Sequence, residues 1–86
     1  MPPNPVEVAE AAFLAARDAA DALAVARARG VPTDALEADA ARSRRAAKEA
    51  LAAVATDGLG AGELRAVSVM REALVRLRGD RLVGDR

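Results

Sequence analysis

Apolar and polar residues follow the period of an α-helix in three segments of the chain, which glycine and proline separate. At about 100° per residue, the middle segment places most of its charges opposite one apolar side. That side carries Leu36, Ala40, Ser43, Ala47, Ala50, Leu51 and Val54. The last segment gathers Val67, Met70, Leu74 and Leu77 in the same way. Both patterns predict amphipathic helices that bury one face.

The first segment has a much wider apolar surface. Val6, Phe13 and Leu23 lie on one stripe, and alanines on both sides widen that stripe to an arc of roughly 200°. One neighbouring helix cannot cover such an arc, so we expect this segment to lie in a groove between two helices. A second subunit is one alternative. The other is a ligand cavity lined by small residues: Ala16, Ala20, Ala40, Ser43 and Ala47.

Capping residues predict where the first helix begins and ends. Asn4 stands before Pro5, and Glu7 follows at the third helical position, which is a typical helix start. Gly30 can adopt the left-handed conformation that closes a helix ending at Arg29. The first predicted helix therefore covers about residues 5–29.

Similar signals bound the other two helices. Thr33 or Asp34 can cap the second helix, and Gly58 favours its end near residue 56. Gly60 can cap the third helix, which Gly79 is expected to stop. These positions predict helices over about residues 34–56 and 61–78.

Short connectors make consecutive helices antiparallel, and no strand-like alternation persists. The predicted fold is all-α, an up-down-up three-helix bundle in one domain over residues 1–86, with an N-terminal lead at 1–4 and a frayed tail at 79–86. A weaker alternative is a hairpin of the first two helices that completes its core with a second copy.

Composition excludes several kinds of function. With neither cysteine nor histidine, the chain lacks a thiolate nucleophile, a neutral-pH imidazole base and the usual zinc ligands. We therefore expect no enzyme, no cofactor and no metal. No apolar run reaches the roughly 18 residues that span a bilayer, and no signal peptide begins the sequence. We expect a soluble protein that contacts no membrane, cytoplasmic if it is natural.

Two groups of residues are candidates for binding. Leu14, Val25, Val69 and Val75 fall outside the apolar stripes, where a protein partner or a second copy could touch them. Arg42, Arg44, Arg45 and Lys48 place four cations within seven residues. A solvated helix face explains this basic patch best, because acidic residues lie at helical-neighbour spacing. The zero net charge and the absence of stacking aromatics argue against nucleic acid.

The Asn-Pro entry, the Gly-Val-Pro connector, the glycine exits and the alanine-filled helices resemble computationally designed, idealised helical bundles. This resemblance covers residues 4–56 best and implies a non-enzymatic scaffold or protein-binding module. One alternative is a small natural bacterial or phage accessory protein from a high-GC genome, which self-assembles or binds nucleic acid through Arg42, Arg44, Arg45 and Lys48. A further alternative is small-molecule binding in the alanine-lined cavity.

Overall fold

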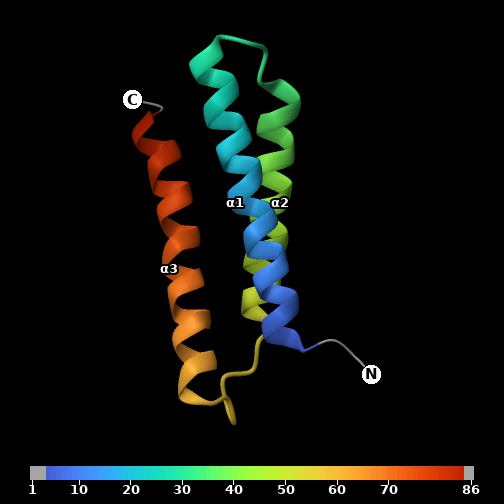
Figure 1. Ribbon diagram of the computed structural model, residues 1–86, viewed down its shortest axis with the longest axis vertical. Helices are drawn as coiled ribbons and strands as arrows, with labels where there is room; N and C mark the ends of the chain where they lie inside the picture. Colours follow the sequence, from blue (N-terminus) through green and yellow to red (C-terminus); the bar gives the residue numbers. More distant parts are fainter. Residues whose placement is uncertain (1–3, 85–86) are drawn as a thin grey trace.

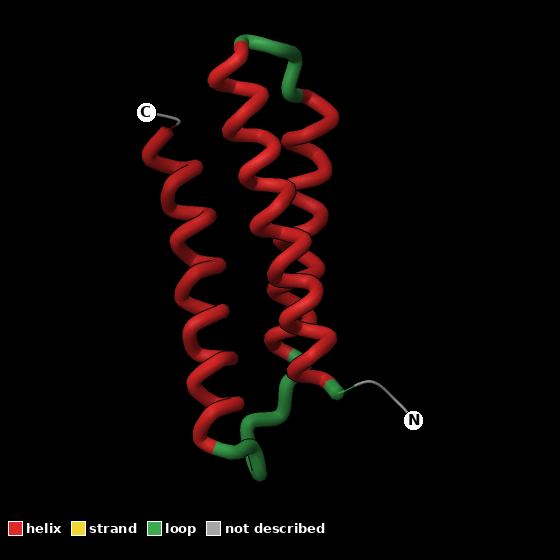
Figure 2. Tube along the Cα trace, viewed as in Figure 1, coloured by secondary structure: helices red, strands yellow, loops and turns green. Residues whose placement is uncertain are grey.

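The computed structural model describes the backbone of residues 4–84 and the side chains of residues 4–77. It contains α1 (Pro5–Arg29), α2 (Asp34–Ala52) and α3 (Ala61–Gly84), as Figure 1 shows. Helices are the only regular elements within residues 4–84 (Figure 2). The all-α three-helix fold predicted from the sequence is confirmed. Residues 1–3 of the expected lead and 85–86 of the expected tail lie outside the described residues.

Both ends of α1 form as their capping residues predict. The Oδ1 atom of Asn4 accepts a hydrogen bond from the backbone N–H of Val6 at 2.9 Å. At the other end Gly30 adopts φ 71°, and its N–H donates to the carbonyl of Arg27. The N–H of Val31 reaches back to the carbonyl of Ala26 at 3.2 Å. This pair of bonds satisfies helix carbonyls that would otherwise lack partners.

The second helix is shorter than the sequence predicts, because α2 ends at Ala52 and not near residue 56. Its last turn tightens, with the N–H of Val54 donating to the carbonyl of Leu51 at 3.3 Å. Leaving the helix lets Val54 turn into the core, where it is 5% exposed. Gly58, with φ 85°, lies in the connecting loop and does not cap α2.

The third helix is longer than predicted. Gly79 does not stop it, and the first six residues of the expected frayed tail continue α3 to Gly84. Glycine inside a helix costs only about 1 kcal/mol relative to alanine, and no proline follows to remove a backbone donor. Gly79 is therefore a weak point in the helix and does not terminate it.

Packing between the helices is uneven. The contact between α1 and α2 is far more extensive than the contact of either helix with α3, which lies beside the pair in Figure 1. The main core lies towards the end where α1 begins and α2 finishes. It contains Val6, Ala9, Ala16, Ala47, Leu51, Val54, Val67, Met70 and Leu74.

The wide apolar arc of α1 is covered only in part. Ala9 and Ala16 are almost fully buried. Val8, Ala15 and Ala22, at the edges of the arc, remain exposed. Intramolecular packing thus accounts for a stripe of α1 and not for its whole apolar width.

Candidate functional site

The four predicted interface residues all lie on the surface. The side chains of Leu14, Val25, Val69 and Val75 are 37%, 51%, 57% and 70% exposed. Leu14 and Val25 are eleven positions apart and therefore within about 20° of each other around α1. Val69 and Val75 are six positions apart, which places them about 120° apart on α3. These residues consequently belong to separate surfaces.

One of these surfaces is a groove between α2 and α3. It has a volume of about 450 Å³, and α3 contributes Leu74 and Val75 to its walls. The facing residues of α2 are Ala41, Arg44, Arg45 and Lys48. Three members of the predicted basic patch and one member of the predicted interface therefore meet in a single site, which we call the α2–α3 groove.

Helix geometry explains why these α2 residues share the groove. Positions 41, 44, 45 and 48 fall within an arc of about 100° around the helix axis, so they lie on one face of the helix. Arg45 and Lys48 are exposed, and Arg44 is half-buried. Leu74, at 8% exposed, closes the bottom of the groove, whereas Val75 stands open to solvent at its edge.

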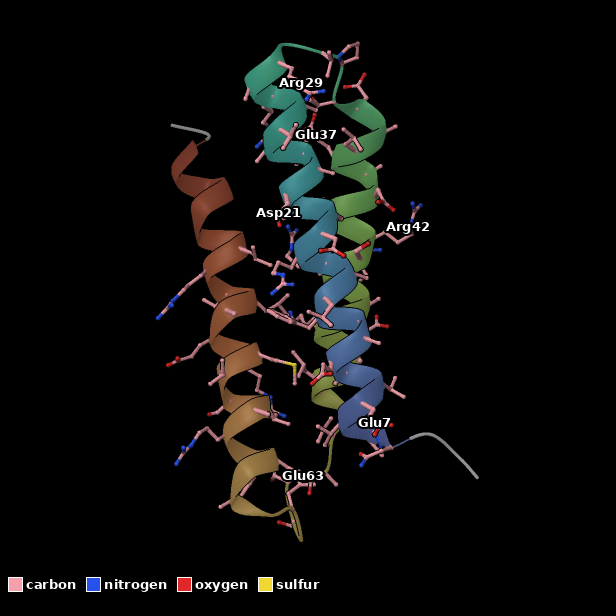
Figure 3. All side chains as sticks on the ribbon, in the orientation of Figure 1. Glu7, Asp21, Arg29, Glu37, Arg42 and Glu63 are labelled. Atoms are coloured by element: carbon pink, nitrogen blue, oxygen red, sulfur yellow. The ribbon has the colours of Figure 1, made fainter. Side chains whose placement is uncertain are left out.

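The fourth basic residue, Arg42, lies outside the groove. It is two positions from Arg44 and hence about 160° from it around α2. Its Nη2 atom donates to Oδ1 of Asp39 at 2.9 Å, an exposed pair on one helix. In Figure 3 its side chain extends from the side of α2 away from α3. The basic patch predicted from the sequence is thus divided between two faces.

Arg71 links the two helices that form the groove. Its Nη2 atom donates a hydrogen bond to the backbone carbonyl of Leu51 at 2.9 Å. Leu51 belongs to the last turn of α2, where carbonyls have no partner inside the helix and favour a cation. This contact joins residues twenty positions apart, and sequence reasoning did not anticipate it.

A second hollow lies next to the groove, between α1, α2 and Leu77 of α3, and Arg44 lines both hollows. Its volume is about 240 Å³, and its lining includes three of the small residues expected for a ligand cavity: Ala16, Ala20 and Ala40. Of the other two, Ala47 is completely buried in the main core and Ser43 is half-buried.

Charged residues surround this alanine-lined cavity. Arg27 and Glu37 both line it, and they approach within 3.7 Å of each other. The carboxylate of Glu37 also accepts a hydrogen bond from the hydroxyl of Thr33 at 2.7 Å. Thr33 occupies the N-cap of α2 but makes no side-chain hydrogen bond to the helix backbone. Two of the four charged lining residues, Arg27 and Glu37, thus pair with each other, and Asp21 and Arg44 are the other two.

The chemistry of the described residues is limited. Within residues 4–77, no polar or charged side chain is buried, and no group of carboxylates is arranged to hold a metal ion. None of the described helices is long and apolar enough to cross a membrane. Comparisons with protein families, curated proteins and solved structures find no match for this chain.

Proposed function

We propose that this protein is a non-enzymatic binding module whose α2–α3 groove accepts an acidic, amphipathic helix of a partner protein. The observation that carries the proposal is that Arg45, Lys48 and Val75 line one groove. An amphipathic helix in a groove presents apolar anchors and a charged margin, and this groove offers the complement of both. Acidic residues on the partner would meet the cations of α2.

The charge distribution favours a protein partner over nucleic acid. The whole chain carries no net charge, so the general attraction to phosphate that drives nucleic-acid binding is missing. Arg42, which would complete a continuous basic surface, is paired with Asp39 on another face. Three cations beside an exposed valine suit a local acidic and apolar ligand better than a polyanion.

The structure offers less support for an enzyme or a small-molecule carrier. Catalytic side chains need positioned and partly desolvated polar groups, whereas the described polar side chains are all at least partly exposed. The alanine-lined cavity has about half the volume of the groove, and two of its four charged lining residues, Arg27 and Glu37, pair with each other. The α2–α3 groove remains the stronger site.

The direct test uses a labelled helical peptide with leucine at positions i, i+4, i+7 and i+11 and glutamate at the flanking positions. Fluorescence anisotropy at low ionic strength gives its Kd for the protein. Lys48→Glu should raise the Kd at least about tenfold, because it places like charges across a close interface. Val75→Asp should weaken binding by a similar factor, through loss of an apolar contact and added repulsion.

Arg42→Glu provides a matched control, because it makes the same charge change on α2 outside the groove. It should alter the Kd less than about twofold, since exposed charges off the interface are largely screened. An equal loss in Arg42→Glu and Lys48→Glu would mean that only overall charge matters. That result, or displacement of the peptide by duplex DNA, would overturn the proposal.

A further inference from the structure

The alanine-lined cavity begins where the main core ends. Ala16 belongs to the core and also lines the cavity. Leu23 and Ala40 are buried, but they are not part of the main core. Small side chains such as Ala20 and Ala40 stand where larger ones would fill the space between the helices, so a hollow is left there.

The size and lining of this cavity suit a small ligand with an apolar body. Its volume of about 240 Å³ exceeds the roughly 150 Å³ of an apolar cavity that holds one benzene molecule. A single ring with a short arm therefore has room. Six of the ten lining residues are apolar: Ala16, Ala20, Leu23, Ala24, Ala40 and Leu77.

The charged part of the lining differs in how far its members already have partners. Arg27 and Glu37 approach within 3.7 Å of each other, and Arg44 also has an interaction partner. By contrast, no hydrogen bond or ion pair joins Asp21 to another residue within the described part of the chain. Asp21 is thus the charged lining group whose carboxylate remains open to a ligand.

Asp21 lies at the opening of the cavity. Its side chain is exposed, whereas Ala16, Leu23 and Ala40 are buried beneath. Figure 3 shows Asp21 on the side of α1 that faces α3. A ligand with a cationic end can therefore keep that end in water beside Asp21 while its apolar body enters the cavity, which avoids burying a charge.

We infer that the alanine-lined cavity binds a small organic cation, a primary amine on a compact apolar body, with its ammonium group beside Asp21. The apolar lining removes the body of the ligand from water, and the carboxylate selects its charge. This site goes beyond the proposed function and does not depend on it. The α2–α3 groove carries Arg45 and Lys48, which repel the same cation.

The experiment compares three ligands of one shape: benzylamine, benzyl alcohol and benzoate. Nuclear magnetic resonance at low ionic strength follows the backbone amides during each titration. Benzylamine should bind with a Kd of about 1 mM, since a ligand of so few atoms gains little binding energy. Its shifts should centre on Ala20 and Ala40 and leave Lys48 unchanged. Benzyl alcohol should bind about fivefold more weakly, as expected for loss of one exposed ion pair, and benzoate more weakly still.

Asp21→Asn tests the charge contact. It should raise the Kd of benzylamine about fivefold and leave that of benzyl alcohol unchanged, because it removes the charge and keeps the shape. Asp18→Asn is the matched control, since it makes the same change at an exposed position of α1 outside the cavity lining. It should change the Kd of benzylamine less than about twofold.

Ala20→Leu tests the space itself. The larger side chain should fill the cavity and abolish binding of both benzylamine and benzyl alcohol, whereas Ala15→Leu, on an exposed part of α1, should bind both as the wild type does. Far-UV circular dichroism checks that each variant keeps its helices. The Asp21→Asn result stands even if Ala20→Leu does not fold, because Asp21 is exposed.

Three results would overturn the inference. One is the absence of a saturating shift up to about 10 mM benzylamine, well above the expected Kd. Another is equal affinity for benzylamine and benzyl alcohol. The third is an equal loss in Asp18→Asn and Asp21→Asn. Failure of the acidic peptide to bind the groove would contradict the proposed function alone, since the two sites are titrated with different ligands.

Discussion

At the scale of single residues, Arg71 makes a side-chain hydrogen bond that joins two helices. Its guanidinium donates to the carbonyl of Leu51, one of the last carbonyls of α2, and so fastens α3 to the end of that helix. Val54 then turns into the core three residues later. The side chain of Arg71 on α3 thus binds at the point where α2 ends earlier than the sequence predicts.

Arg71→Met should lower the free energy of unfolding by about 1 kcal/mol, because the charged hydrogen bond is lost while the carbonyl of Leu51 keeps its bond from the N–H of Val54. Urea denaturation followed by circular dichroism measures the change. Arg76→Met, also on α3 and exposed, should change stability by less than about 0.5 kcal/mol. Equal effects of the two substitutions would contradict a specific role for Arg71.

At the scale of elements, two glycines show how backbone conformation decides whether glycine or alanine is more stable at a position. Gly58 lies in the loop before α3 with φ 85°, whereas Gly62 lies in the first turn of α3 without a positive φ. A Cβ atom added at either position would meet no other group within 4 Å. The two sites thus differ in backbone angle and not in available space.

Substitution by alanine should therefore change the stability of the protein in opposite directions at Gly58 and Gly62. Gly62→Ala should stabilise the protein by up to about 1 kcal/mol, because alanine loses less conformational freedom in a helix. Gly58→Ala should destabilise it by about 1 kcal/mol or more, since alanine rarely adopts a positive φ. Thermal unfolding of both variants tests the pair, and shifts of the same sign would contradict the assigned loop conformation.

At the scale of the whole molecule, the uneven packing divides the bundle into a tight α1–α2 pair and a more loosely attached third helix. Buried alanines such as Ala16 and Ala47 let α1 and α2 approach closely. The groove on one side of α3 and the alanine-lined cavity near Leu77 both lie where this helix meets the pair. The attachment of α3 therefore controls the shape of the candidate sites.

Hydrogen exchange should reveal this division. Amides in the middle of α3 should exchange faster than those in the middle of α1 and α2, because a helix with less packed surface opens at a lower free energy. Exchange measured residue by residue by nuclear magnetic resonance provides the test. Equal protection across the three helices would mean that the bundle opens only as one unit.

The sequence by itself determined the number of helices, the bounds of α1 and the start of the other two. Those features depend on local chemistry: the period of apolar residues, the Asn4 cap and a left-handed Gly30 act within a few positions. The same reasoning identified exposed apolar residues and a cluster of cations. It could not place them relative to one another, because their grouping depends on contacts between helices.

Tertiary structure decided the rest. It ended α2 at Ala52, where a core position for Val54 and the bond from Arg71 outweigh four more residues of helical propensity. It also divided the basic patch, leaving Arg42 on one face and bringing Lys48 beside Val75. The physical reason is common to these results: helix signals are local, whereas a groove exists only after two helices pack at a particular rotation.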